Sequence, residues 1–312
     1  MSLLARPTVA FPAAKVMQRL NNLLADRHVA SSLHKRYPEY PRDTHELTIP
    51  TSVAPARAVV YVPDRPADAP LPPVHVNFHG GGFVLPPVEL DDPLCRFLAA
   101  EAGAVVVNVD YVVAPQHPFP APPRQAYEVV EWVAGHGAEH GWDGNLLTVG
   151  GQSAGGALAA AVARQALQKG GPSIALQILH YPPLDLLTNA RDKRSVIAKP
   201  LLRPWMADIF DTSYVPDPEL RGDPLVSPAH PSDTADLTGI APALVITPEH
   251  DLLHAEGTRY AERLRSVGAL RDHCDVPGAD HGYDQNDAET ARDIYGLMAQ
   301  HMREGVGGPY VR

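Results

Sequence analysis

The chain has 312 residues, of which 45% are hydrophobic and 20% charged, and its formal net charge is −10. This composition is typical of a globular protein with one large core, and the negative charge argues against a nucleic-acid partner. No run approaches the roughly eighteen apolar residues of a transmembrane helix, so no membrane span is expected.

The N-terminal residues lack a basic region followed by a sustained apolar core, so a secretion signal is not indicated and a cytoplasmic protein is expected. The two cysteines, Cys95 and Cys274, lie in apolar or strand-like settings. They could pair in an oxidising compartment, but buried thiols in a reducing cytoplasm are the favoured interpretation.

Residues 1 to about 43 contain a helical segment and a proline-marked loop. The helix is indicated by apolar residues at helical spacing, namely Val16, Leu20, Leu23 and Leu24. Two stretches that follow, 44–49 and 58–62, are typical of antiparallel edge strands. The helical segment carries no catalytic pattern of its own.

The next strand, 74–78, runs directly into His79-Gly80-Gly81-Gly82-Phe83. Because glycine has no side chain, the backbone amides of Gly81 and Gly82 can approach a substrate oxygen, as in the oxyanion hole of enzymes with such a loop. The plain alternative is a flexible glycine turn. His79 is expected to order the loop rather than to act as a base.

The chain is organised around Gly151-Gln152-Ser153-Ala154-Gly155, between an apolar run at 146–149 and a helix-forming run at 157–167. This pattern is typical of a nucleophile elbow, in which a serine occupies a strained turn from a strand to a helix. The helix N-terminus would leave the amide of Ala154 free to meet a developing negative charge. The motif alone is weak, but its strand–turn–helix setting favours a catalytic serine.

Strands and helices alternate through most of the remaining chain, which predicts a mostly parallel sheet with right-handed crossovers. We expect strands at 104–109, 174–179, 243–247 and about 272–276, and helices at about 123–135, 255–267 and 288–303. Residues of about 185–238 interrupt this rhythm with scattered prolines and aromatics, which indicates a lid. Its composition predicts an apolar acyl pocket of limited length, with Phe83, Trp205 and Phe210 as substrate-contacting residues.

A serine nucleophile needs a base and an acid that orients the base. In this architecture the acid and then the histidine follow the serine, each in a loop after a strand. Asp251 and His281 occupy such positions. Glu249 and Asp280 are rivals for the acid, although Asp280 is adjacent to His281 and would have difficulty reaching its imidazole.

The i, i+4 pair His250 and His254 has the spacing of metal ligands, but no third ligand is apparent. The pair also flanks the proposed acid. No metal is therefore expected.

The order of these motifs resembles the hormone-sensitive-lipase-like group of α/β-hydrolase carboxylesterases, over roughly residues 45–304. The motifs are His79 to Phe83, Tyr111 to Pro120, Gly151 to Gly156, Asp251-Leu252-Leu253 and His281-Gly282. The resemblance implies an α/β fold, with a mostly parallel central sheet, helices on both faces and a helical cap formed by about 1–43 and 185–238. The length of 312 residues is compatible with one α/β domain that carries an inserted lid or with two separate domains, and we favour a single domain.

The same resemblance implies Ser153 as nucleophile, His281 as base, Asp251 as its partner, and Gly81, Gly82 and Ala154 as amide donors. Two departures stand out. Many members have Asp in place of Gln152, and Asp-Pro-Leu in place of Asp251-Leu252-Leu253. These differences bear on substrate preference and local loop shape more than on the chemistry.

The function expected from the sequence is a serine carboxylesterase that hydrolyses small to medium acyl esters through an acyl-enzyme, without a cofactor. An amidase or deacetylase with the same triad is an alternative. A third reading is a non-catalytic small-molecule receptor, because plant gibberellin receptors resemble this group. Those receptors lack the triad histidine, whereas His281 is present here. The partner expected is an ester substrate, and a homodimer stays open.

Overall fold

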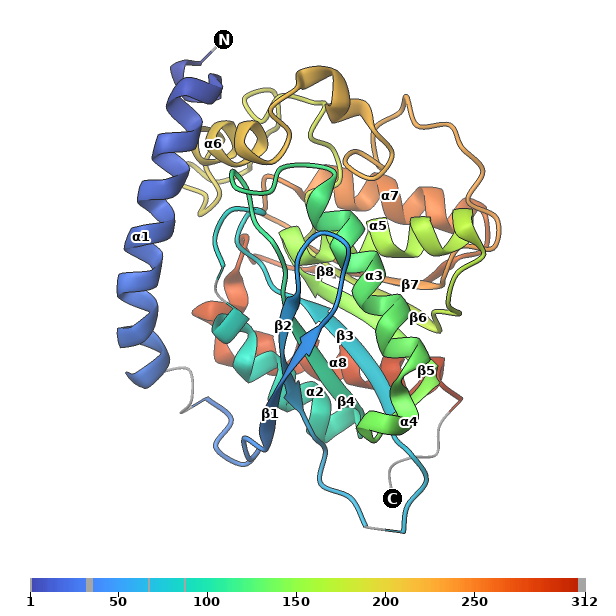
Figure 1. Ribbon diagram of the computed structural model, residues 1–312. Helices are drawn as coiled ribbons and strands as arrows, with labels where there is room; N and C mark the ends of the chain where they lie inside the picture. Colours follow the sequence, from blue (N-terminus) through green and yellow to red (C-terminus); the bar gives the residue numbers. More distant parts are fainter. Residues whose placement is uncertain (1, 32–35, 67, 87, 308–312) are drawn as a thin grey trace.

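A computed structural model describes residues 2–31, 36–66, 68–86 and 88–307, with only the backbone described for 24–31. Its centre is an eight-stranded sheet in the order β1-β2-β4-β3-β5-β6-β7-β8 (Figure 1). The strands are β1 Thr44–Ile49, β2 Ala56–Tyr61, β3 Pro73–Phe78, β4 Val105–Asp110, β5 Asp143–Gln152, β6 Leu176–His180, β7 Ala243–Pro248 and β8 Leu270–Val276.

The sheet is mostly parallel, as the alternation of strands and helices predicts. β2 is antiparallel to both β1 and β4, and all the other pairs are parallel. Only β1 is an edge strand on that side, so the prediction of two edge strands is wrong for β2, which lies one strand further in.

Helices cover both faces of the sheet (Figure 1). The helices are α1 Pro7–Ser31, α2 Asp92–Ala102, α3 Ala121–Gly135, α4 Gly137–His140, α5 Ala154–Lys169, α6 Pro204–Tyr214, α7 His254–Ser266 and α8 Ala288–Gly305. Short 3-10 turns lie at Leu3–Ala5, Val88–Asp91, Pro218–Gly222 and Tyr283–Gln285. Of the helices, the sequence predicted neither α2 nor α4, and it placed α6 only within the interrupted segment of about 185–238.

The core is divided by the sheet, because successive side chains of a strand point to opposite faces. Val105 and Val107 of β4 join the cluster that contains α3, α5 and α7. Val106, between them, joins the cluster on the opposite face with α2 and α8. Parallel strands that are buried on both faces read as continuous apolar runs, which is why they were visible in the sequence.

The N-terminal helix packs against α6 and not against the sheet (Figure 1). It buries its small residues Ala10 and Ala14, whereas Val16, Leu20 and Leu23 are 52%, 54% and 68% exposed. The apolar spacing in the sequence therefore identified the helix but not its buried face. The side chain of Leu24, which belonged to the same pattern, lies outside the described residues.

The polar side chain of Gln18 ties α1 to the rest of the molecule. Its Nε2 donates to the carbonyls of Val84 and Ala114, at 2.8 and 2.9 Å. Both carbonyls belong to the loops that follow β3 and β4, so the helix is fixed above the carboxyl ends of those strands.

Cys95 is buried and Cys274 is half-buried, and both are free thiols. No helix in the described part of the chain combines the length and the apolar character that crossing a bilayer requires.

Candidate active site

Ser153 lies at the sharp turn between β5 and α5, with φ 52° and ψ −120°. The turn needs glycine on both sides of Ser153, because the backbone there packs directly against the end of β3. A β-carbon on Gly155 would lie 1.7 Å from the carbonyl oxygen of Phe78, and one on Gly151 would lie 2.3 Å from the same oxygen. The backbone amide of Ser153 donates to the carbonyl of His180 at 2.9 Å, which holds the strained residue in place.

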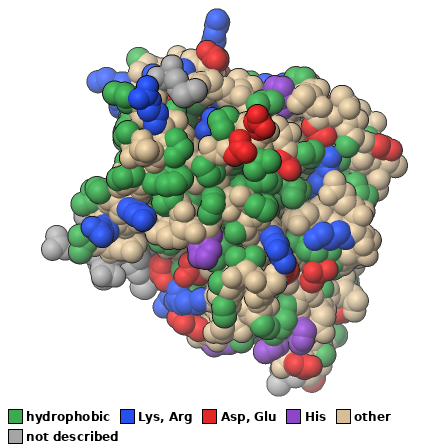
Figure 2. All heavy atoms as spheres, turned by 45° about the horizontal axis from the view of Figure 1, so that its top comes forward, with side chains coloured by type: hydrophobic (Ala, Val, Ile, Leu, Met, Phe, Trp, Pro, Cys, Tyr) green, Lys and Arg blue, Asp and Glu red, His purple; other side chains and the backbone are tan. Residues whose placement is uncertain are grey.

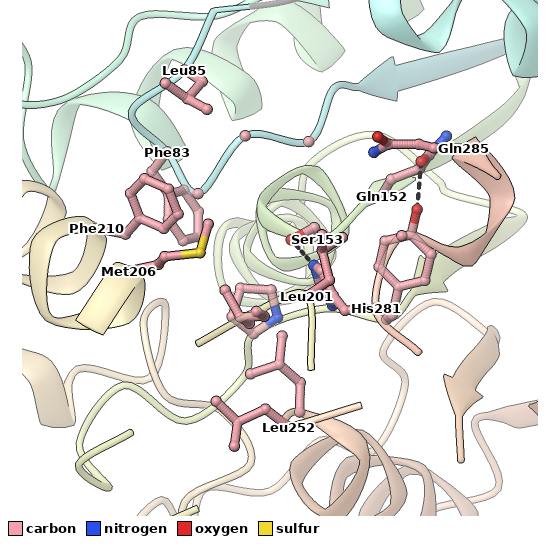
Figure 3. A pocket seen from close by; sticks show the side chains of 18 of the residues that line it. Phe83, Leu85, Gln152, Ser153, Leu201, Met206, Phe210, Leu252, His281 and Gln285 are labelled. Atoms are coloured by element: carbon pink, nitrogen blue, oxygen red, sulfur yellow. Dashed lines mark hydrogen bonds between the residues drawn. The ribbon is translucent and has the colours of Figure 1, made fainter. Parts of the chain in front are cut away.

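The structure brings Ser153, His281 and Asp251 together in one hydrogen-bonded chain. Ser153 Oγ lies 3.0 Å from His281 Nε2 (Figure 3), and His281 Nδ1 lies 2.7 Å from Asp251 Oδ2. Asp251 follows β7 and His281 follows β8, so two parallel strands deliver both side chains to the same edge of the sheet as the serine. Asp251 is 2% exposed, and its second oxygen accepts from the amide of Leu253.

The electrostatics of this group favour a histidine that can hold a proton. Burial alone would lower the pKa of His281, but the charge and hydrogen bond of Asp251 outweigh burial and raise the pKa above its ordinary value. The neighbouring carboxylates Asp280 and Asp284 act in the same direction. An imidazolium formed during a reaction is therefore stabilised where it forms.

The two rival acids are engaged elsewhere. Glu249 accepts from the amide of Gly278 at 2.7 Å. Asp280 accepts from the backbone amides of Leu201 and His281, at 2.6 and 2.8 Å. Neither carboxylate hydrogen-bonds the imidazole, whereas Asp251 does.

The glycine loop after β3 adopts conformations that side chains resist. Gly81 has φ 117° and Gly82 has φ 61°, and a β-carbon on Gly81 would lie 2.5 Å from the carbonyl oxygen of Leu85. Among the described residues, no acceptor pairs with the backbone amides of Gly81, Gly82 or Ala154. These donors are therefore available to a substrate oxygen.

His79 supports the loop from below. It is fully buried, its ring stacks on Tyr111 at 4.3 Å between centroids, and Nδ1 lies 2.6 Å from the carbonyl of Gly80. Tyr111 also donates to the carbonyl of His79 at 3.0 Å. Burial lowers the pKa of His79 to about 4, so this histidine is neutral at physiological pH.

Ser153 and His281 open onto a cavity of about 340 Å³, here called the central cavity. Figure 3 shows Phe83, Leu85, Met206 and Phe210 on one side of Ser153. We call this side the apolar end. On the opposite side, which we call the polar end, Figure 3 shows Gln152 and Gln285. Hydrogen bonds join Gln152 to Tyr181, Asp284 and Tyr295, which also line the cavity, and Asp91 lines it close enough to Asp284 to sense its charge.

Two of the three expected substrate contacts line this cavity. Phe83 and Phe210 do, and Phe83 stacks on Tyr214 with 3.8 Å between ring centroids. Trp205 does not belong to the lining, and its side chain is 44% exposed. The expectation for Trp205 is therefore corrected: its helical neighbour Met206 faces the cavity instead, because adjacent residues on a helix point in different directions.

Sequence reasoning missed several lining residues. Leu252 and Leu253 were noted only as departures from a motif, although both line the central cavity. Tyr181 and Asp284 were not singled out, but each had a signal. Tyr181 directly follows β6, and Asp284 lies in the loop that carries His281.

The face that carries α1 and α6 is rich in apolar side chains, with charged groups around them (Figure 2). Its exposed large residues include Val16, Leu20, Leu201 and Trp205. Within the described ranges, no group of three or more metal-binding side chains is placed to hold an ion. His254 lies 3.1 Å from Asp275, outside the central cavity.

Comparisons with known proteins agree with this geometry. A family model for the alpha/beta hydrolase fold matches residues 75–285. The chain is 36% identical over 211 residues to carboxylesterase NlhH of Mycobacterium tuberculosis, covering 68% of this chain and 66% of that protein, which is just under two thirds of its length. It is 34% identical to esterase LipI of the same organism, covering 76% and 74%.

Solved structures give the same result over nearly the whole chain. The hyperthermophilic esterase of the archaeon Pyrobaculum calidifontis superposes with a TM-score of 0.82 at 34% identity, covering 93% of this chain and 91% of that one. The chain therefore belongs to the hormone-sensitive-lipase-like carboxylesterase group of the α/β-hydrolase superfamily.

Proposed function

We propose that this member of a carboxylesterase group cleaves its substrates with Ser153 as nucleophile, His281 as general base and Asp251 as the acid that orients the base. The observation that carries the proposal is the continuous hydrogen-bonded chain from Ser153 Oγ through His281 to Asp251, at the wall of a cavity. A serine hydroxyl becomes a useful nucleophile only when a base accepts its proton.

In the first half of the reaction, Ser153 Oγ attacks the ester carbonyl while His281 Nε2 takes the hydroxyl proton. The unpaired amides of Gly81, Gly82 and Ala154 support the negative oxygen of the tetrahedral intermediate. The intermediate collapses, the carbon–oxygen bond to the alcohol breaks, and His281 gives its proton to the leaving alkoxide. An acyl-enzyme on Ser153 remains.

In the second half, water replaces the alcohol. His281 takes a proton from the water, whose oxygen attacks the acyl carbonyl, and the same amides hold the second oxyanion. Collapse returns the proton to Ser153 and releases the carboxylic acid. No cofactor takes part in these steps.

Two features support small to medium acyl esters as substrates. The central cavity, at about 340 Å³, lies at the lower limit of the size that small-molecule sites have in general. Its apolar end, with Met206 and Phe210, offers a surface for an acyl chain of limited length. The non-catalytic receptor reading is disfavoured because His281 is present and bonded to both of its partners.

We also propose that the chain forms a single domain whose cap consists of the N-terminal segment and residues 185–238. Asn21 of α1 and Phe210 of α6 both line the central cavity, which supports this role. A cytoplasmic location stays a proposal, supported by the two free thiols. A homodimer remains a prediction that sedimentation or size-exclusion measurements would test.

The experiment that tests the function is hydrolysis of p-nitrophenyl esters of increasing acyl length, beside matching p-nitroanilides. We expect kcat/KM to be highest for short to medium esters and far lower for the anilides. Ser153→Ala should abolish turnover while its melting temperature stays near that of the parent protein. Faster cleavage of anilides than of esters would move the assignment to an amidase.

A further inference from the structure

The polar end of the central cavity has no role in the proposed catalytic steps. Figure 3 shows Gln152 and Gln285 close together on the side of Ser153 opposite Met206 and Phe210. Gln152 is the residue immediately before the nucleophile, so this end begins directly beside the reacting serine.

Asp284 forms a rigid part of this end. Tyr181 donates to its Oδ1 at 2.7 Å and Tyr295 donates to its Oδ2 at 2.8 Å. The hydroxyl oxygen of Tyr181 also lies 2.6 Å from the side-chain amide of Gln152. One hydroxyl proton cannot serve two acceptors, so the Gln152 amide pairs best when its NH₂ group faces Tyr181. All these groups then satisfy one another.

Asp91 differs from Asp284 because only one of its two carboxyl oxygens accepts a hydrogen bond from the described residues. It is 5% exposed and lines the central cavity. One carboxyl oxygen accepts from Asn77 Nδ2 at 3.0 Å, and in the described part of the chain no donor reaches the other. A buried acceptor that faces a cavity without a partner is a place where a ligand donor gains a hydrogen bond.

Asp91 is only partly ionised at neutral pH. Burial, with the nearby charge of Asp284, raises the pKa of Asp91 to about 7. The Arg36 guanidinium donates to the backbone carbonyls of Asp284 and Gln285, and it lines the same cavity. This end therefore offers a hydrogen-bond acceptor without a strong negative field, which suits a neutral donor better than a cation.

We propose that the polar end binds a hydroxyl group of the substrate, carried by its alcohol or acyl part, with Asp91 as the acceptor. The substrates are then hydroxylated esters in preference to plain alkyl esters. An alkyl group at this end would leave the buried carboxyl unpaired, and an ammonium would share the cavity with the Arg36 guanidinium. This inference rests on the proposed esterase function, because it names the substrate class of that site.

The test uses esters of equal chain length that end in methyl, hydroxyl, methoxy or dimethylammonium, with the variable group first in the alcohol part and then in the acyl part. At the chain length that reaches Asp91, we expect kcat/KM for the hydroxyl ester to exceed that for the alkyl ester about ten-fold or more, in at least one series. Equal rates at every length in both series, or a preference for the ammonium ester, would overturn the proposal.

Variants of Asp91 separate recognition from stability. Asp91→Ala removes the acceptor and should bring the hydroxyl-to-alkyl ratio close to one. In Asp91→Asn the amide oxygen still accepts from Asn77, and the NH₂ group faces the cavity. This donor can bind the oxygen of a hydroxyl or of a methoxy group, so the ratio of kcat/KM for the hydroxyl ester to that for the methoxy ester should fall close to one. The matched control is Glu89→Gln, a carboxyl in the same 3-10 turn that pairs with Arg57 and does not line the cavity, which should keep the parent ratio. An unchanged ratio in both folded Asp91 variants contradicts the role of Asp91.

Binding to Ser153→Ala distinguishes this inference from the proposed function. Calorimetry with the intact hydroxyl and alkyl esters measures the preference without turnover, and tighter binding of the hydroxyl ester supports the polar end. If the parent protein hydrolyses no ester, the proposed function is wrong. The binding preference is then still tested, because it is measured without turnover. Equal affinity of both esters would overturn the inference.

Discussion

The two walls of the central cavity are built by different means. The catalytic wall consists of strand ends and tight turns, in which backbone geometry leaves almost no freedom: Gly155 could not hold even a methyl group beside the Phe78 carbonyl. The other wall, here called the cap wall, is formed by the segments that we propose as the cap, namely α1, α6 and the loops of 185–238, where side chains do the packing. Large apolar residues such as Leu23 and Trp205 remain exposed there.

This difference explains which parts can be changed independently. A substitution in the catalytic wall displaces a backbone donor or changes a side chain with a role in the proposed chemistry, so its effect falls on kcat. A substitution in the cap wall changes the volume or polarity that a substrate meets, so its effect falls on preference among substrates. The predictions below test this division, from the largest effect to the smallest.

Asp251→Asn should cause the largest loss of kcat. The amide cannot stabilise the imidazolium and favours the wrong tautomer of His281, which costs about 10⁴-fold in kcat in enzymes with such a triad. The measurement is steady-state hydrolysis of a short p-nitrophenyl ester. Glu249→Asn is the control, because that carboxylate binds the amide of Gly278 and not the imidazole. A loss of the same size in both variants would reassign the acid.

Gly81→Val should lower kcat by about 10²–10³-fold, the usual loss when one oxyanion donor is misplaced. The reason is steric, since the new β-carbon would meet the Leu85 carbonyl and the backbone has φ 117°. KM should change less. Gly268→Val is the matched control, because Gly268 also has positive φ but nothing lies within 4 Å of the added carbon.

Gly82→Val belongs to the same test, although its added carbon would first meet the Phe210 ring. A folded Gly81→Val, Gly82→Val double variant with near-normal kcat would show that the loop is only a turn. Thermal melting of each variant separates this outcome from unfolding.

Phe210→Ala should change acyl-chain preference by about ten-fold, because a hydrophobic pocket discriminates by roughly 1–3 kcal/mol per methylene. The enlarged apolar end should favour longer chains, measured as the ratio of kcat/KM for long and short esters. Trp205→Ala is the control from the same helix, and it should leave the ratio unchanged because Trp205 does not line the cavity. Equal shifts in both variants would remove the distinction between the two positions.

The smallest expected effect is a shift in the midpoint of the pH–rate profile. In the proposed mechanism the neutral imidazole is the base, so kcat/KM should rise as His281 loses its proton. Because Asp251 raises the pKa of His281 despite burial, the midpoint should lie above the ordinary value of about 6.5. A pH–rate profile with its midpoint below about 6.5 would mean that burial outweighs Asp251.

The division between the two walls also decides what the sequence could reveal. The catalytic wall depends on backbone conformation, which demands glycine at Gly151 and Gly155 and leaves a readable spacing. The parallel strands are buried on both faces and leave continuous apolar runs. These constraints made the elbow, Asp251 and His281 visible.

The residues of the cap wall show no comparable pattern in the sequence. Its helices expose large apolar residues and bury small or polar ones such as Ala14 and Gln18, so apolar spacing indicated the wrong face of α1. The choice between Trp205 and Met206 depends on the rotation of one helix, which packing against distant residues decides. The polar end is likewise assembled from separate segments, with Asp91 and Asp284 far apart in the chain.

The central claim is that Ser153 is an activated nucleophile. The measurement that tests it most directly is labelling by a fluorophosphonate, followed by mass spectrometry of the modified peptide. We predict one label per chain, located on Ser153, with complete loss of hydrolysis and with labelling abolished in Ser153→Ala and strongly slowed in His281→Ala. Absence of labelling, or stoichiometric labelling of another residue, would contradict the account.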